Sequence, residues 1–125
     1  MKKIPFELFG EGQYMYMDIG RFITLETLTG KPIGEILKNN EVDLGFTVKF
    51  LTVALRHHGN KQPQFYIDKI QEACETSDND VLTDIQMAIV RAVAGSGVLG
   101  KAYYYAVFPE EMTEEAKKDV ESEKN

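Results

Sequence analysis

Residues 13–37 read QYMYMDIGRFITLETLTGKPIGEIL, and this stretch decides the fold. Its first part alternates tyrosines with apolar residues, a period of two that is typical of a β-strand. The apolar residues Phe22, Leu25 and Leu28 then follow at helical spacing, and Gly30 can end that helix in a left-handed conformation. The proline two residues later suits the first turn of a second short helix. We therefore expect a strand that leads directly into two short helices.

The residues before this stretch predict a partner for its strand. Ile4, Phe6 and Leu8 alternate with other residues, and the glycines of 10–12 can form a turn. Residues 3–19 therefore predict a β-hairpin. Because an isolated two-stranded hairpin is marginally stable in water, one of its faces must pack on helices or join a third strand.

Further helices are expected along the rest of the chain. Residues 44–57 are apolar on most sides, which is typical of a central helix. A helix follows Pro63, and another extends from Val81 to about Ala94. The aromatic residues of 98–108 suit a strand, but the neighbouring sequence favours a helix, and we expect a helix there.

The sequence predicts a mainly α (α+β) fold, with an N-terminal β-hairpin packed on a compact bundle of about five to six helices. The length of 125 residues suits one globular domain, which we place at residues 1–108, with the hairpin at 3–19 and helices from residue 20 on. Residues 109–125 predict an acidic tail that is partly disordered or a frayed helix capped by Thr113.

The net charge of −6 is concentrated in the tail, which holds seven acidic residues and three lysines. The rest of the chain is nearly neutral and has no basic cluster, so we expect no nucleic-acid binding. We also expect no membrane insertion, because no apolar run reaches about 18 residues. The single cysteine allows no intrachain disulfide and agrees with a reducing cytoplasm.

Two motifs invite a chemical interpretation. Residues 95–100 match G-x-G-x-x-G, but a predicted helix precedes them where a nucleotide site needs a strand, so we expect a glycine break between two helices. His57 and His58 are adjacent, so on a helix they would point about 100° apart, and we expect them to interact with the negative end of the helix dipole.

No group of residues suggests catalysis. Cys74 lies on an apolar helix face and is expected to be buried. Glu26 is expected at a solvated helix edge. The sequence does not bring together a nucleophile, a base and an orienting group. It also offers too few ligands for a zinc site. We therefore predict a protein without enzymatic activity, metal site or cofactor.

The aromatic residues are the candidates for partner binding. Three consecutive tyrosines cannot all face one core, and exposed tyrosine is enriched at interfaces. The candidate partner-binding residues are Tyr14, Tyr16, Tyr103, Tyr104, Tyr105 and Phe108.

Residues 4–60 resemble the tail assembly chaperones of long-tailed bacteriophages and their relatives in gene transfer agents. The resemblance rests on the strand pair, on LETLTGKPI at 25–33, and on an apolar helix that ends in LRHHG at 55–59. It implies a mostly helical, non-catalytic protein of the bacterial host cytoplasm. It also implies binding to the tape-measure protein, whose apolar helical faces are exposed before the tail tube assembles. The tail-tube protein and a frameshifted longer form of the chain are further candidate partners.

Two other functions stay open. A small structural virion or adaptor protein could assemble through the hairpin edge and exposed tyrosines. A small enzyme or ligand-binding domain could be built on the glycine break. Self-association is compatible with all three hypotheses.

Overall fold

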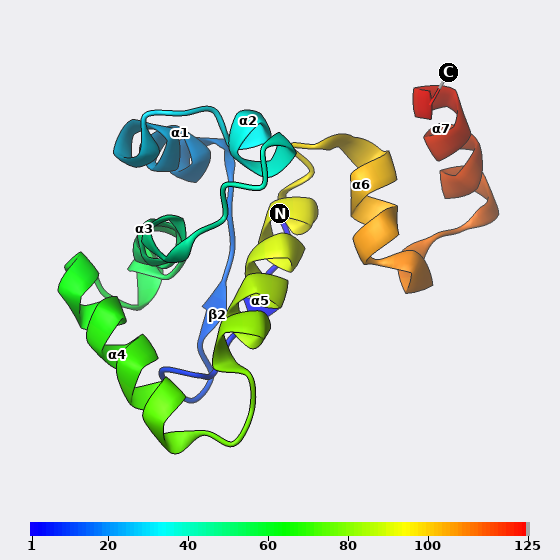
Figure 1. Ribbon diagram of the computed structural model, residues 1–125. Helices are drawn as coiled ribbons and strands as arrows, with labels where there is room; N and C mark the ends of the chain where they lie inside the picture. Colours follow the sequence, from blue (N-terminus) through cyan, green and yellow to red (C-terminus); the bar gives the residue numbers. More distant parts are fainter. Residues whose placement is uncertain (125) are drawn as a thin grey trace.

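The computed structural model describes residues 1–124. The fold is mainly α, with an N-terminal hairpin packed on helices, as predicted (Figure 1). In chain order the elements are β1 (Ile4–Pro5), β2 (Tyr14–Met15), α1 (Ile19–Thr29), α2 (Ile33–Lys38), α3 (Leu44–Ala54), the 3-10 helix η1 (Arg56–His58), α4 (Pro63–Thr76), α5 (Val81–Ser96), α6 (Gly100–Val107), the 3-10 helix η2 (Pro109–Glu111) and α7 (Glu114–Lys124).

The hairpin is much shorter than the sequence predicted. β1 and β2 pair antiparallel over two residues each, with Ile4 opposite Met15, and one further bond joins the Phe6 N–H to the Gln13 carbonyl. Pro5 has no N–H to donate, which limits the ladder. The alternation nevertheless persists in burial, because Ile4, Phe6, Met15 and Met17 all face the core. The period of two thus marks four of the buried side chains, but Leu8, the third apolar residue of the first alternation, is exposed, and the length of the strands was overestimated.

Helix α3 lies at the centre of the fold, as expected, and packs against α1, α4 and α5. Phe50, Leu51 and Ala54 are completely buried. The prediction that this helix reaches residue 57 was wrong, because α3 ends at Ala54 and the chain tightens into η1. Leu44, at the other end of the predicted stripe, is exposed.

The glycine run at residues 95–100 separates two helices, as predicted. Helix α5 ends at Ser96, and Gly97 adopts the left-handed conformation with φ 80°. Residues 100–107 then form α6, which confirms a helix there and excludes the strand. The tail continues as η2 and α7, and the Thr113 hydroxyl caps α7 by accepting the Ala116 N–H at 3.0 Å. In Figure 1, α6 and α7 extend away from the α1–α5 body.

A second glycine allows the N-terminus to lie against α5. The Lys2 N–H donates to the Gly95 carbonyl at 3.1 Å. A Cβ atom at residue 95 would lie only 2.8 Å from the Lys2 Cβ. Gly95 is therefore needed for the close approach of the first strand to the end of α5 (Figure 1).

Candidate protein-binding surfaces

A buried arginine joins the hairpin, α1 and α3. Arg21 lies on the inner face of α1 and is only 3% exposed. Its Nη1 donates to the carbonyls of Val53 (2.9 Å) and Ala54 (3.1 Å), at the C-terminal end of α3. Its Nη2 donates to the Tyr16 hydroxyl at 2.7 Å, and the guanidinium lies 3.8 Å from the centre of that ring. Arg21 thus satisfies carbonyls at the negative end of α3.

Two histidines extend this network to the backbone of β2. The Nδ1 of His57 lies 3.1 Å from Arg21 Nη1 and must accept, because a guanidinium only donates. The His57 Nε2–H then donates to the Tyr14 carbonyl at 2.8 Å. The Nε2 of His58 lies 3.1 Å from the Tyr14 N and 3.0 Å from the Tyr14 carbonyl oxygen, so its tautomer decides whether it accepts the N–H or donates to the carbonyl. The two bonds of His57 require its imidazole to be neutral.

The electrostatics of the network agree with a neutral His57. Burial is the largest effect and lowers the pKa of His57 below its ordinary 6.5, and the positive charges of His58, Arg21 and Lys3 act in the same direction. The hydrogen bond to the Tyr14 carbonyl acts in the opposite direction. The expected dipole role of the histidines is therefore wrong, since Arg21 occupies the α3 carbonyls and the histidines hold β2.

The predicted tyrosine candidates of the hairpin belong to the same network. The Tyr14 and Tyr16 rings stack with their centroids 6.3 Å apart, and His57 packs on both. Both tyrosines are half-buried. The Tyr14 N–H and carbonyl already lie within hydrogen-bond distance of the histidines, so this part of the β2 edge is closed to another strand.

The C-terminal candidates lie on and after α6. Phe108 is fully buried and offers no exposed surface to a partner. The Tyr104 hydroxyl donates to Glu111 at 2.8 Å, and Glu111 pairs with Lys2 at 2.7 Å. Tyr103, Tyr104 and Tyr105 are all half-buried, and burial raises the pKa of Tyr103 and Tyr104. That the five tyrosines bind a partner stays a prediction.

Other residues singled out in the sequence lie elsewhere. Cys74 is exposed on α4, contrary to the expected burial. Glu26 is not simply solvated, because its carboxylate accepts the Ile33 N–H at 2.9 Å and thereby joins α1 to α2. Within residues 1–124, no cluster of three His, Cys, Asp or Glu side chains could hold a metal ion. No helix in that part of the chain is long and apolar enough to cross a membrane.

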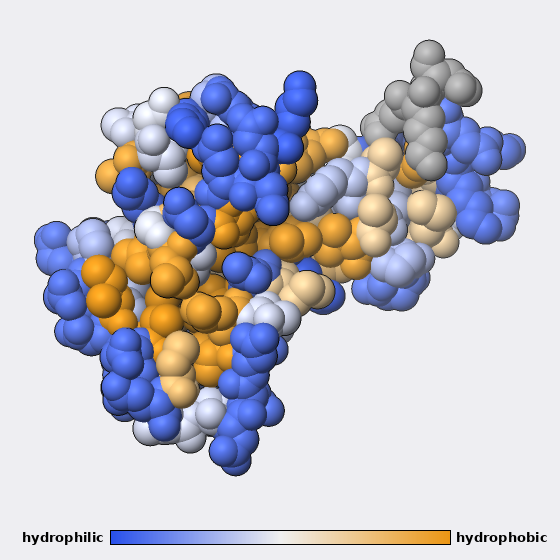
Figure 2. All heavy atoms as spheres, viewed as in Figure 1, coloured by the Kyte–Doolittle hydropathy of each residue, from blue (hydrophilic) through white to orange (hydrophobic). Residues whose placement is uncertain are grey.

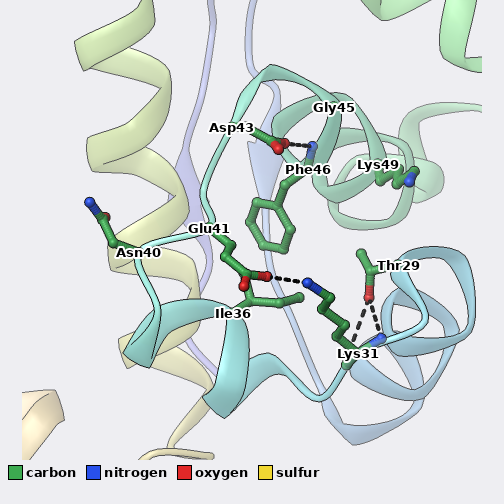
Figure 3. A pocket seen from close by; sticks show the side chains of 9 residues that line it. All are labelled: Thr29, Lys31, Ile36, Asn40, Glu41, Asp43, Gly45, Phe46 and Lys49. Carbon is green, nitrogen blue, oxygen red and sulfur yellow. Dashed lines mark hydrogen bonds and ion pairs between the residues drawn. The ribbon is translucent and has the colours of Figure 1, made fainter.

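A hollow of about 460 Å³ lies between the ends of α1, α2 and α3. Figure 3 shows the side chains that line it. Two acidic and two basic residues line it, so its charges balance. The Lys31 ammonium lies 2.6 Å from Glu41, and Asp43 accepts the Phe46 N–H at 2.8 Å as the cap of α3. Most of these charges are engaged in holding the chain, and the hollow favours neither anions nor cations.

Two apolar surfaces are more distinctive. The outer face of α1 exposes Ile19 (63%) and Ile23 (60%). Leu28 is also exposed, although the sequence predicted it within the apolar stripe of this helix, with Ile23 beside that stripe. The second set, which we call the α3–α5 apolar surface, comprises exposed Leu44 of α3 (59%) and Ile67 of α4 (45%), with Val48 of α3 and Leu82 of α5, which are half-buried against the core. Figure 2 shows apolar side chains gathered over α3, α4 and α5, bordered by hydrophilic ones.

The charge around the α3–α5 apolar surface is strongly biased. Residues 63–84, which form α4 and the start of α5, carry one basic side chain, Lys69. The same segment carries six acidic side chains: Asp68, Glu72, Glu75, Asp78, Asp80 and Asp84. This bias is visible in the sequence itself.

Comparison with known proteins identifies no relative. No protein-family model, no curated protein and no solved structure matches this chain.

Proposed function

We propose that this protein is a phage or prophage tail assembly chaperone. In this proposal it acts in the bacterial cytoplasm and binds an apolar helical segment of the tape-measure protein on the α3–α5 apolar surface. The observation that carries the proposal is the exposure of Leu44 on α3 and of Ile67 on α4 in a helical fold. Figure 2 shows apolar side chains over the same helices. An apolar helix face commonly binds in such a setting, with its side chains spaced one turn apart.

The acidic residues of segment 63–84 add a requirement on the partner. A helix bound beside α4 and α5 would be favoured by Lys or Arg next to its apolar stripe, because opposite charges speed association and select the orientation. Exposed acidic residues also keep the free protein soluble while an apolar surface is uncovered.

The polar groups support a binding role rather than a catalytic one. Arg21 is a buried charged side chain, and its N–H groups donate to Val53, Ala54, Tyr16 and His57. These contacts hold α1, α3 and the hairpin together. A structural virion or adaptor protein that assembles through the hairpin edge is less well supported, because Pro5 lacks an N–H and the Tyr14 backbone is already bonded.

Co-expression tests the proposal. The wild-type protein should raise the soluble yield of the tape-measure protein encoded in the same phage or prophage, and the two should copurify. The double variant Leu44→Asn/Ile67→Asn should lose both effects, because polar amides would enter the apolar contact.

Ile23→Asn is the matched control, since it makes the same kind of change at another exposed site, on α1. It should rescue the partner as well as the wild type does. No rescue by the wild type, or equal loss in the double variant and the control, would contradict the proposal.

A further inference from the structure

The outer face of α1 lacks a free charge, which is unusual for an exposed helix in a chain of 27% charged residues. The two charged residues of α1 are both occupied: Arg21 is buried, and Glu26 bonds to the Ile33 N–H. The hydroxyls of Thr24 and Thr27 donate to carbonyls of their own helix, at 3.2 and 3.0 Å. Their polar groups are therefore satisfied within α1, and little polar desolvation opposes the covering of this face.

We propose that this face binds a second copy of the same chain, with the two α1 helices antiparallel about a two-fold axis. A two-fold interface requires a surface that is complementary to itself, so a projecting group must meet a matching depression on the other copy. Both are present on α1.

The projection is Ile19, near the start of the helix. The depression is a shallow hollow of about 410 Å³ at the other end, lined by Ile23, Glu26, Thr27, Gly30, Lys31 and Pro32. Antiparallel pairing places Ile19 of each copy over the hollow near Gly30 of the other. A Cβ atom built at Gly30 would have no neighbour within 4 Å, so the hollow is open there.

The same register aligns charges of opposite sign. If Ile19 meets the Gly30 hollow, Asp18 lies opposite Lys31, and Ile23 lies opposite Glu26 and beside Thr27. Asp18 and Lys31 flank α1 at its N- and C-terminal ends, so a two-fold axis forms this opposite-charge pair twice. Lys31 is already 2.6 Å from Glu41, so the pair contributes to orientation more than to affinity.

The distribution of charge favours this face over others for self-association. The net charge of −6 comes mainly from the acidic segment 63–84 and from the tail, whereas residues 1–62 carry seven acidic and eight basic side chains. Two copies therefore meet at α1 with the least mutual repulsion.

The size of the face predicts a weak dimer. A helix of 11 residues is about 16 Å long, and one such face buries less than the roughly 800 Å² per partner of a standard stable interface. The dimer should therefore be in equilibrium with the monomer at moderate protein concentrations. This proposal is independent of the tape-measure partner, which binds a different surface.

Sedimentation velocity over a wide range of protein concentration tests the dimer. The average mass should rise from 14.2 kDa toward twice that value. Ile23→Asn should raise the dissociation constant at least about tenfold, because each dimer loses two isoleucines from its centre. Ile67→Asn, the matched control on α4, should leave it unchanged.

Cross-linking tests the register. In a Cys74→Ser background, mixing Ile23→Cys with Thr27→Cys should give more disulfide-linked dimer than either variant alone, because residue 27 of one copy lies within one position of the residue opposite Ile23 of the other. A disulfide requires Cα atoms within about 7 Å, and in this register two residues 23 are displaced by three positions along the helix and two residues 27 by five. A monomeric mass at every concentration, an equal effect of Ile67→Asn, or no preference for the mixed pair would overturn the proposal.

Discussion

Two polar networks each join parts of the chain that are distant in sequence, and they differ in burial. The first is centred on Arg21, which is almost fully buried and reaches Tyr16, His57 and the end of α3. The second joins Lys2 to Glu111 and Tyr104 on the surface, at 2.7 and 2.8 Å. The hydrogen-bond distances in the two networks are similar, so geometry alone does not show which network stabilises the fold more. The buried network should dominate stability, because a buried group left unsatisfied cannot turn to water.

Replacing Arg21 by Met should produce the largest effect. The change removes the donors to two carbonyls at the end of α3, to the Tyr16 hydroxyl and to His57, and leaves these acceptors in a region that excludes water. We expect the free energy of unfolding to fall by on the order of 3 kcal/mol, measured by urea denaturation.

Two further variants isolate the cause. Arg56→Met removes an exposed arginine from the adjoining η1 and should change stability little. Arg21→Lys should restore only part of the loss, since an ammonium cannot reproduce the planar fork of the guanidinium. If Arg21→Met is no worse than Arg56→Met, the buried network does not dominate.

Gly95→Ala tests the same comparison in another way, because it strains the backbone contact of Lys2, just before β1, with the end of α5 and leaves the Lys2 side chain in place. The new Cβ would lie 2.8 Å from the Lys2 Cβ, which is close to the backbone and cannot simply rotate away. We expect a loss of about 1–3 kcal/mol in the same denaturation experiment.

Gly34→Ala is the matched control within a helix. Nothing lies within 4 Å of a Cβ atom at residue 34, and α2 should gain about 0.5–1 kcal/mol from the lower flexibility of the unfolded chain. Equal effects of the two alanines would show that the contact with Lys2 is unimportant.

Sequence patterns predicted the order of elements because local signals determine them. Asp18 caps α1 by accepting the Arg21 N–H, and Gly30 ends α1 with φ 74°, both as their residue types indicate. The periodicity also located the central helix. What it could not provide was the end of α3, which depends on Arg21 reaching from another helix to the Val53 and Ala54 carbonyls.

The candidate surfaces were harder to predict for a related reason. A helical stripe shows which residues are apolar, but not which side of a short helix meets the core. Phe22 and Leu25 are buried, whereas Ile23 and Leu28 are exposed, although all four belong to one apolar run. Phe108 follows a cluster of aromatic residues, and the sequence therefore favoured it as a partner-binding residue. In the structure, packing against distant parts of the chain buries it. The one sequence feature that indicated the buried network was Arg21, a single arginine within an apolar helix.

Acid should weaken the buried network through His57. Its pKa lies below the ordinary 6.5 in the folded protein, because burial disfavours the charged imidazole, so the unfolded chain binds the proton first as the pH falls. Stability is therefore complete above about pH 6.5 and decreases as the pH falls toward the folded-state pKa. We expect the midpoint of urea unfolding to decrease between pH 7 and pH 5, a range above the ordinary values of the carboxyl groups.

His57→Gln separates this contribution from that of other groups. The variant is less stable at neutral pH, but its stability should depend less on pH in this range because one titrating group is missing. A wild-type midpoint that stays constant or increases on acidification would contradict a neutral His57 held by Arg21 and Tyr14.

The surface network should give the smallest effect, and Glu111→Gln measures it. The hydrogen bond from Lys2, followed by that from Tyr104, lowers the pKa of Glu111 below its ordinary 4.5, so its contribution is present above that pH and is lost as the pH falls further. At neutral pH we expect only a slight decrease in the unfolding midpoint relative to Glu110→Gln, an equally exposed neighbour, and added salt should reduce the difference because ions screen exposed charges. A decrease in stability as large as that of Arg21→Met, and insensitive to salt, would mean that burial does not distinguish the two networks. The attachment of η2 to the N-terminus would then stabilise the fold as strongly as Arg21 does.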